Sequence, residues 1–237
     1  YFKIFFDKKP DTTDYLTSFI SALNYISGID QKSYLKVCEK YLKPFVNNIK
    51  YDKLSNPKEN KKIKIGFLSG DLKTHSVSFF LKGLIPNINK EKFEIIFFSN
   101  LDISKHDDYT NFFKSFSNQW FDIFSLEDDL VIEKVRSLNL DVLIDLSGFF
   151  EGNRLQVLVN RCAKIQIGWL GYNNSLGIKN LDYLIADFNL VKSDEQNQYS
   201  EKILFLPKIW NAMPIPKDLP NIKTNKDKSK NIFSFGS

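Results

Sequence analysis

Residues Asp145–Arg161 (DLSGFFEGNRLQVLVNR) and Ile165–Gly177 (IQIGWLGYNNSLG) decide the fold of this chain. Two short apolar runs, Val142–Leu146 and Ile165–Leu170, each end in a polar loop that contains glycine, and an amphipathic segment of helix length separates them. This is the pattern of two parallel strands joined by a crossover helix. Open α/β sheets bind ligands beyond the carboxyl ends of their strands. We therefore expect the ligand-contacting residues in the loops that follow the two runs.

Strand and helix patterns also alternate through the rest of residues 61–222. Apolar runs rich in β-branched and aromatic residues predict strands; they are Ile63–Leu68, Phe93–Ser99, Trp120–Phe124, Tyr183–Ala186 and Ile203–Leu206. Amphipathic segments predict the helices between them; they are Ser78–Leu84, Tyr109–Phe116 and Asp128–Leu138. Such an alternation predicts an α/β domain built on a parallel sheet.

Residues 1–60 differ from this pattern, because they contain two predicted helices and no strand. The helices are expected at Asp14–Tyr25 and Gln31–Val46, with Gly28 and Asp30 as the break and the N-cap between them. The polar segment Ser55–Lys62 contains proline and clustered charge and predicts a domain boundary. We therefore divide the chain into a helical linker region (1–60), an α/β domain (61–222) and a second linker with a further strand (223–237).

Composition excludes several classes of protein. The chain has 237 residues, of which 43% are hydrophobic and 15% aromatic, as in a globular protein. No run reaches the length of a membrane span and no signal peptide is recognisable, so we expect a cytoplasmic protein without a membrane partner. The two cysteines lack paired spacing, which argues against a disulfide framework or a metal site. The net charge is +5, but lysines and acidic residues are interspersed, so we expect no nucleic-acid partner.

A long, ordered motif supports a family resemblance. Residues 145–187, followed by Tyr199–Pro207 (YSEKILFLP), resemble the N-terminal half of the catalytic region of glycosyltransferase family 41. That family contains the nucleocytoplasmic O-linked N-acetylglucosamine transferases and their SPINDLY-type relatives. The resemblance implies a Rossmann-like open parallel sheet, the N-terminal half of a GT-B fold, preceded by a short all-α linker at the end of a possible tetratricopeptide-type region. Residues 223–237 resemble the linker and first strand of a C-terminal Rossmann-like domain, so we expect a fragment that is inactive alone.

The resemblance also implies a reaction. It is the transfer of N-acetylglucosamine from UDP-N-acetylglucosamine to a serine or threonine hydroxyl of an acceptor protein or peptide, without a cofactor or metal ion. Fucose and glucose remain alternative donor sugars. A different class of function is a degenerate, non-catalytic binding or assembly module of the same fold. An NAD-dependent enzyme is disfavoured, because no G-x-G-x-x-G follows the first strand.

The loop Ser69–Ser78 (SGDLKTHSVS) is the first candidate for chemistry, since it joins a strand to a helix and holds His75. Histidine exchanges protons near neutral pH. In the family, the corresponding loop resembles S-S-D-F-G-N-H-P-T-S-H, in which His75 falls on the active-site histidine and Phe79 replaces the second one. The alternative is a loop histidine that caps the following helix. The other histidine, His106, lies in a polar loop and is expected to be solvent-exposed.

Arg154, Arg161 and Asp187 are further candidates. A guanidinium group offers a planar fork to carboxylate or phosphate, and both arginines match arginines of the family pattern. We expect them to bind substrate, or else to form internal ion pairs with Asp145 or Glu151. Asp187 aligns with the last aspartate of the family's D-Y-x-x-x-D and is expected to be catalytic, with a loop cap as the alternative.

The loop Gly171–Gly177 (GYNNSLG) resembles the family's G-Y-P-G-T-S-G, which presents small residues and backbone amides to the sugar donor. Gly171, Tyr172 and Ser175 are therefore expected to bind substrate. Asn173 and Asn174 stand where the family has proline and glycine. Asparagine tolerates left-handed backbone conformations, so the turn is compatible with the change. The donor and the activity itself stay open at this point.

Overall fold

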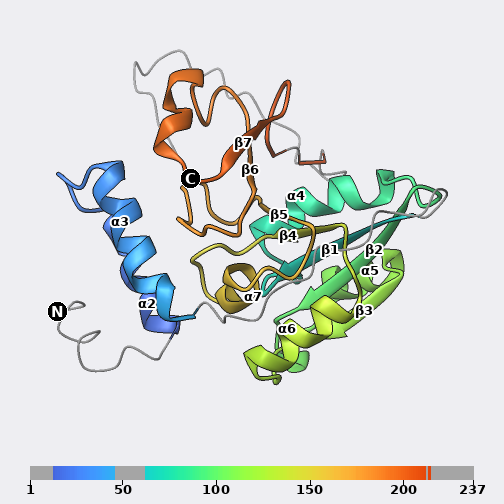
Figure 1. Ribbon diagram of the computed structural model, residues 1–237. Helices are drawn as coiled ribbons and strands as arrows, with labels where there is room; N and C mark the ends of the chain where they lie inside the picture. The colour runs from blue at the N-terminus through green and yellow to red at the C-terminus, as the bar shows by residue number, and fades with distance from the viewer. Residues whose placement is uncertain (1–12, 46–61, 212, 215–237) are drawn as a thin grey trace, which may run out of the picture.

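A computed structural model describes residues 13–45, 62–211 and 213–214. Its centre is a seven-stranded sheet in which every neighbouring pair of strands is parallel, in the order β3-β2-β1-β4-β5-β6-β7 (Figure 1). The strands are β1 (Ile63–Ser69), β2 (Phe93–Ser99), β3 (Gln119–Asp122), β4 (Val142–Asp145), β5 (Ile165–Gly168), β6 (Tyr183–Ala186) and β7 (Lys202–Phe205). The direction of winding reverses between β1 and β4, which is the position where such sheets bind ligands. The fold is thus α/β and Rossmann-like, as expected.

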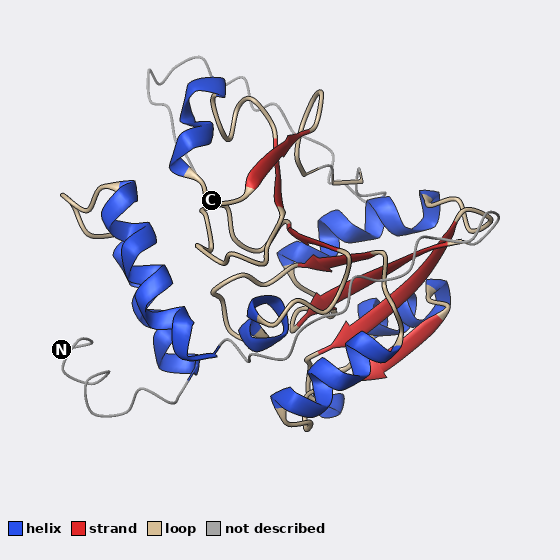
Figure 2. Cartoon of the chain, viewed as in Figure 1, coloured by secondary structure: helices blue, strands red, loops and turns tan. Residues whose placement is uncertain are grey.

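Helices cover both faces of this sheet, which explains why β1 and β2 are continuous apolar runs (Figure 2). Phe67 and Phe97 lie in one buried cluster with residues of α4 and α5, whereas Leu68 and Phe98 lie in the other with residues of α6 and α7. These helices are α4 (Ser76–Leu84), α5 (Asp108–Phe116), α6 (Asp128–Ser137) and α7 (Leu155–Val159). Short 3₁₀ helices occur at Lys43–Phe45, Ile85–Asn87, Ile103–Lys105 and Ser193–Gln198.

A helix pair precedes the sheet, formed by α2 (Thr13–Leu23) and α3 (Gln31–Leu42). The Asp30 side chain accepts a hydrogen bond from the Ser33 backbone N–H (2.8 Å), so the predicted N-cap is confirmed. Gly28 has φ +88°, a left-handed conformation that suits glycine at the break between the helices. The buried faces of both helices contribute to the same apolar cluster as Leu68 and Phe98.

The predicted strands and helices are confirmed within a few residues at their ends. Three details differ. The crossover helix α7 has only five residues, α4 begins at Ser76 rather than Ser78, and residues Ser193–Gln198 form a 3₁₀ helix that the pattern did not predict. Residues 55–61 and 223–237, which carry the predicted linkers and the last strand, lie outside the described residues, so the division into domains stays a prediction.

Over the ranges that the structure describes, none of the helices combines the length and the apolar character that crossing a membrane requires.

Candidate functional site

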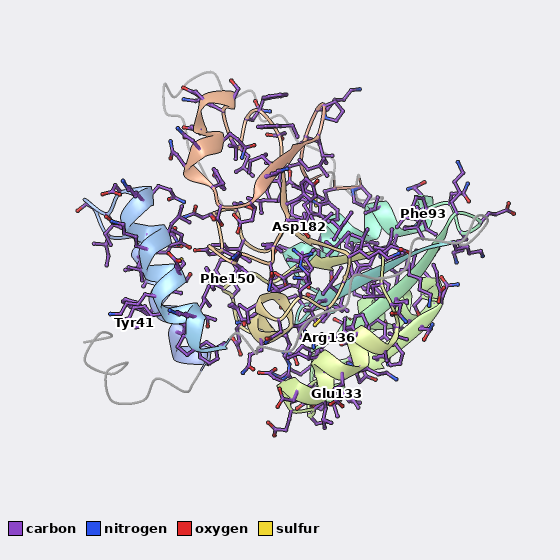
Figure 3. The ribbon with its side chains drawn as sticks, in the orientation of Figure 1. Tyr41, Phe93, Glu133, Arg136, Phe150 and Asp182 are labelled. Carbon is purple, nitrogen blue, oxygen red and sulfur yellow. The ribbon has the colours of Figure 1, made fainter. Side chains whose placement is uncertain are left out.

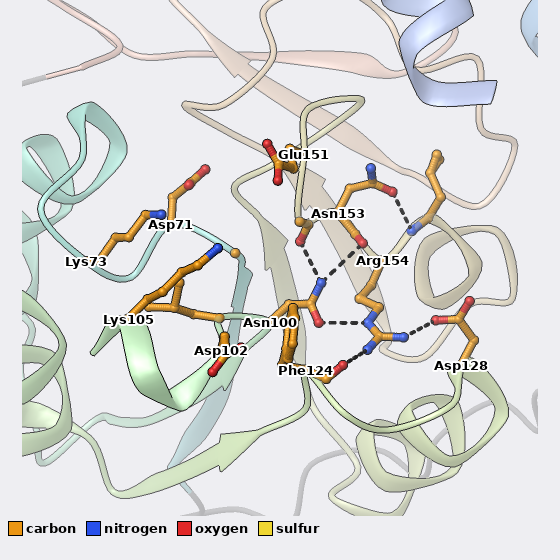
Figure 4. A pocket seen from close by; sticks show the side chains of 14 residues that line it. Asp71, Lys73, Asn100, Asp102, Lys105, Phe124, Asp128, Glu151, Asn153 and Arg154 are labelled. Carbon is orange, nitrogen blue, oxygen red and sulfur yellow. Dashed lines mark hydrogen bonds and ion pairs between the residues drawn. The ribbon is translucent and has the colours of Figure 1, made fainter. Parts of the chain in front are cut away.

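A cavity of about 460 Å³ lies at the carboxyl ends of β1, β2, β3 and β4 (Figure 4). It therefore sits at the reversal point between β1 and β4. The loops after these four strands line it; the lining residues are Gly70, Asp71, Lys73, Asn100, Leu101, Asp102, Lys105, Phe124, Asp128, Glu151, Gly152, Asn153, Arg154 and Leu155. Two of the loops touch through their backbones, because a Cβ added to Gly70 would lie 2.8 Å from the Gly152 Cα.

Arg154 organises one wall of this cavity. Its guanidinium donates to Asp128 Oδ1 (2.7 Å), to Asn100 Oδ1 (3.0 Å) and to the backbone oxygen of Phe124, as Figure 4 shows. It also donates to the backbone oxygen of Ile123 (2.8 Å). The loops after β2, β3 and β4 are thereby held together. The internal ion pair that the sequence suggested as an alternative is present. The partner of Arg154 is Asp128, and the expected partners, Asp145 and Glu151, were wrong. Arg154 and Asp128 lie in segments that are distant in the sequence and adjacent only in the fold.

His75 lies at the N-cap position of α4, beside Asp71, which lines the cavity. Its Nδ1 is 3.4 Å from the Val77 backbone N–H, from which it accepts, and 3.7 Å from Asp71 Oδ2. The capping alternative is therefore observed, while 40% of the side chain remains exposed to solvent. Desolvation raises the pKa of Asp71, although the nearby His75 and Lys73 act in the opposite direction.

Asp145 is a buried carboxyl group at the carboxyl end of β4. Its Oδ2 accepts from the Gly148 backbone N–H (2.7 Å), whereas its Oδ1 has no hydrogen-bond partner among the described residues. Desolvation raises the pKa of Asp145 to about 7, although the Gly148 and Ser147 N–H groups act in the opposite direction. A proton on this side chain near neutral pH is thus a consequence of burial.

The loop Gly171–Gly177 packs tightly on the loop that follows β4. A Cβ added to Gly171 would lie 2.0 Å from the Leu146 carbonyl oxygen, so only glycine fits there. The Tyr172 ring makes edge contacts with Phe149 and with Phe150, which Figure 3 labels (centroid distances 5.2 and 5.6 Å). The loops after β4 and β5, which the sequence selected, therefore do lie side by side.

The side chains of Tyr172 and Ser175 turn inward rather than toward the cavity. Tyr172 is buried and its hydroxyl meets the Tyr34 hydroxyl of α3 (2.9 Å). Ser175 is fully buried, and its Oγ donates to Glu201 Oε2 (2.6 Å). Desolvation raises the pKa of the buried Glu201 carboxyl group. Any contact of this loop with a ligand accordingly falls to its backbone or to the exposed Asn173.

Arg161 and Asp187 lie apart from the cavity. Arg161 precedes β5 and binds Asp182 through both Nη atoms (3.0 and 2.7 Å), at the amino-terminal end of the sheet; Figure 3 labels Asp182. Asp187 follows β6 and accepts from the backbone N–H groups of Leu190, Asn189 and Trp210. Desolvation opposes the charge of Asp187, but these hydrogen bonds outweigh it and lower the pKa. The loop-cap alternative for Asp187 is thus observed.

The expectation for His106 was wrong. Only 12% of its side chain is exposed, because it packs between Lys114, Trp120 and Asp122. The polar residues around His106 in the sequence do not show that its side chain packs against β3 and α5. Within the described ranges, no group of three or more His, Cys, Asp or Glu side chains is arranged to hold a metal ion.

Sequence reasoning missed Asp71 and Glu201 as site candidates. Asp71 had a usable signal, because it follows β1 directly and precedes His75 by four residues. Glu201 had none apart from its place in the YSEK motif, since its contact with Ser175 spans 26 positions of the chain.

The chain is similar to known proteins both in sequence and in structure. The model of the family described as Glycosyl transferase family 41 matches residues 33–222. A probable UDP-N-acetylglucosamine–peptide N-acetylglucosaminyltransferase SPINDLY from Hordeum vulgare is 31% identical over 96% of this chain and 25% of its own length. The protein with the same description from Oryza sativa subsp. japonica is 30% identical over 84% of this chain and 22% of its own length.

A solved structure is also similar. A mutant O-GlcNAc transferase from Thermobaculum terrenum superposes with a TM-score of 0.82 and 26% identity, over 91% of this chain and 41% of that one. The chain thus spans a quarter or less of the length of these two curated relatives and under half of the solved structure.

Proposed function

The chain belongs to glycosyltransferase family 41, and from this membership we propose that it forms part of an enzyme that glycosylates proteins. The proposed donor is UDP-N-acetylglucosamine and the proposed acceptor is a peptide, as the names of the relatives suggest. Within that peptide, we propose a serine or threonine hydroxyl as the acceptor group. The proposal extends to a cytoplasmic site of action and to a further Rossmann-like domain that supplies most of the nucleotide contacts. No cofactor or metal ion enters the proposed step.

The observation that carries this proposal is the polar cavity at the reversal point of the sheet, with the His75–Asp71 pair beside it. In the proposed step the acceptor oxygen forms a bond to the anomeric carbon while the bond from that carbon to the diphosphate oxygen breaks. The acceptor hydroxyl loses its proton, and the nucleoside diphosphate leaves with the bonding electrons. A side chain that handles the acceptor proton must therefore lie close to the cavity, and His75 does so through its contact with Asp71, one of the lining residues.

Asp71 decides which nitrogen of His75 carries the proton in the proposed mechanism. When Nδ1–H faces the Asp71 carboxylate, Nε2 is free to accept the acceptor proton. When Nδ1 instead accepts from the Val77 N–H, Nε2 carries the proton and serves as a hydrogen-bond donor. The contacts of Nδ1 with Asp71 (3.7 Å) and with the Val77 N–H (3.4 Å) are both longer than strong hydrogen bonds. In the proposed mechanism a bound acceptor therefore shifts the ring to the first arrangement.

The loop Gly171–Gly177 is proposed to meet the donor sugar through its backbone. The side chains of Tyr172 and Ser175 turn inward, and the N–H groups of Gly171, Ser175, Leu176 and Gly177 already donate within the protein. The proposed contacts are therefore made by the N–H groups of residues 172–174. Arg154 is proposed to act by holding the cavity wall, since Asp128, Asn100 and two carbonyl oxygens already occupy its guanidinium.

The test is turnover by the full-length protein, with UDP-N-acetylglucosamine, GDP-fucose and UDP-glucose as donors and acceptor peptides as substrates. We expect transfer from the first donor, and a loss of roughly 100-fold or more in kcat for His75→Ala. His106→Ala is the matched control, because this side chain packs at the β3 edge, outside the residues that line the cavity.

Turnover of fucose or glucose instead would reassign the donor. Absence of turnover by a folded full-length protein with all three donors would contradict the proposal and favour a non-catalytic binding module.

A further inference from the structure

Polar side chains join the helix pair to the loop Gly171–Gly177. We call this network the polar bridge. It consists of Asn24, Gln31 and Tyr34 on the helix side and of Tyr172, Asn174 and Ser175 on the loop side. The contacts span about 140 to 150 positions of the chain and are therefore purely tertiary.

Asn174 is the centre of the polar bridge. Its Oδ1 accepts from Gln31 Nε2 (2.8 Å) and from the Ser175 backbone N–H (2.7 Å). Its Nδ2 donates to Asn24 Oδ1 (2.7 Å). One side-chain amide thus fixes its own loop and binds the residue after α2 and the first residue of α3.

Tyr34 forms the buried half of the polar bridge. Its side chain is 2% exposed, and its hydroxyl donates to the Ser175 carbonyl oxygen (3.0 Å) and contacts the Tyr172 hydroxyl (2.9 Å). The Tyr172 hydroxyl also accepts from Asn24 Nδ2 (2.5 Å). Because buried hydroxyls need their partners, these contacts fix the loop in one position against α3.

The opposite side of the loop is held by Glu201, which accepts from Ser175 Oγ and from the Leu176 N–H (2.9 Å). Gly177 lies directly on α3, since a Cβ added there would be 2.5 Å from the Cys38 Cβ. The loop is therefore clamped between the helix pair and the segment before β7. Asn174 stands where the family motif has glycine, which has no side chain, so its contacts with Asn24 and Gln31 are ones that the family residue could not make.

We infer that the helix pair α2–α3 is a positioning part of the transfer site, in which Asn174 and Tyr34 hold the loop Gly171–Gly177 in the conformation that receives the donor sugar. This inference rests on the proposed function. It assigns to the helical region an indirect role in donor binding, through residues that position the loop and touch neither the sugar nor the acceptor.

The experiment measures two quantities on the full-length protein and on its Asn174→Ala and Tyr34→Phe variants. The first is amide hydrogen exchange in residues 171–177, and the second is steady-state kinetics with UDP-N-acetylglucosamine and an acceptor peptide varied in turn. We expect faster exchange in this loop and a fall of roughly 10- to 100-fold in kcat/KM for the donor. The KM for the acceptor should stay within about twofold of the original, because the misplaced group is a donor contact.

Tyr25→Phe and Lys36→Ala are the matched controls, since both side chains are exposed on the same helical region. Neither should change the exchange or the kinetics. Asn24→Ala combined with Asn174→Ala should lose less than the sum of the single losses, because both substitutions remove one shared contact.

Unchanged exchange in residues 171–177 would overturn the inference, whether or not the protein is active. Faster exchange with unchanged donor kinetics would overturn the positioning role alone. If the unsubstituted protein turns over no donor, the proposed function fails and the positioning role fails with it. Donor turnover and amide exchange are measured independently, so a failure of the proposed function can be told apart from a failure of the contact between the helix pair and the loop.

Discussion

At the residue scale, burial and hydrogen bonding act in opposite directions on the carboxyl group of Asp145. One oxygen accepts from the Gly148 N–H, whereas the other has no partner among the described residues. Desolvation outweighs the hydrogen bonds and raises the pKa of this group.

Asp145 leads to a prediction on pH. Its pKa in the folded protein is about 7, well above the value near 4 of an unfolded chain. Between pH 4 and pH 7 the folded protein thus holds a proton that the unfolded chain has lost, so the free energy of unfolding falls as the pH rises. Asparagine at this position cannot titrate and should remove this dependence.

Urea unfolding of Asp145→Asn and of the original protein at pH 5 and pH 8 measures the effect. Between pH 5 and pH 8 the original protein should lose about 2 to 3 kcal/mol of its free energy of unfolding relative to the variant. Parallel pH profiles for the two proteins would show that Asp145 is ionised in the folded state at both pH values.

The sequence located His75 but not the environments of the other side chains. His75 was placed correctly in the loop after β1, because a strand–loop–helix pattern defines that position locally. The Arg154–Asp128 pair and the inward turn of Ser175 were not predictable, since both depend on partners 26 positions away. A carboxyl group or guanidinium in a sequence shows what it can bind, and only the fold selects the partner.

At the element scale, the pattern of apolar residues predicted the strands and most helices, because each of these elements contributes apolar side chains to a buried cluster. It overestimated the crossover helix. Residues 147–154 form the loop after β4 that the sequence predicted, but α7 occupies only Leu155–Val159 of the segment between this loop and β5. The helix stops at its C-cap Asn160, and Arg161 has φ +43°, so the chain leaves the helical conformation there without a glycine or proline that would show this in the sequence.

Asp107, the N-cap of α5, connects this element to the candidate site. Its Oδ1 accepts from the Tyr109 and Thr110 N–H groups, and its Oδ2 accepts from the Thr74 N–H (2.6 Å), next to His75. Burial opposes the charge of Asp107, but these hydrogen bonds outweigh it and hold the pKa at about 2. The stabilisation is therefore present above pH 4 and is lost as the pH falls toward 2.

We expect Asp107→Ala to lower the free energy of unfolding at pH 7 by about 1 to 2 kcal/mol, because α5 loses its cap. The loss should be smaller for Asp107→Asn, which keeps an oxygen acceptor. Urea unfolding measures both variants, with Asp108→Ala, the next position of the chain, as the control. An equal loss in the Asp108 variant would mean that charge near the helix terminus, rather than the cap, is responsible.

At the scale of the whole molecule, the helix pair is part of the core of the α/β sheet. Leu16 and Ile20 of α2 and Cys38 of α3 belong to the same buried cluster as Phe98 of β2 and Leu158 of α7. An amphipathic pattern showed that these helices bury one face, but it does not reveal which surface covers that face. For this reason residues 1–60 read as a separate linker region in the sequence.

The shared core predicts that the helix pair and the sheet unfold together. Ile20 is completely buried, so Ile20→Ala should lower the free energy of unfolding by about 2 to 5 kcal/mol. All three tryptophans, Trp120, Trp169 and Trp210, lie in the α/β part, so their fluorescence reports on the sheet rather than on the helices. The fluorescence transition in urea should shift as far as the far-UV circular dichroism transition, with Lys36→Ala as an unshifted control. A helical transition that moves alone, while the tryptophan signal keeps its midpoint, would mean that the helices dock on a sheet that is stable without them. In that case the polar bridge would open without unfolding the cavity, and donor binding would be sensitive to the helix pair while the stability of the sheet would not.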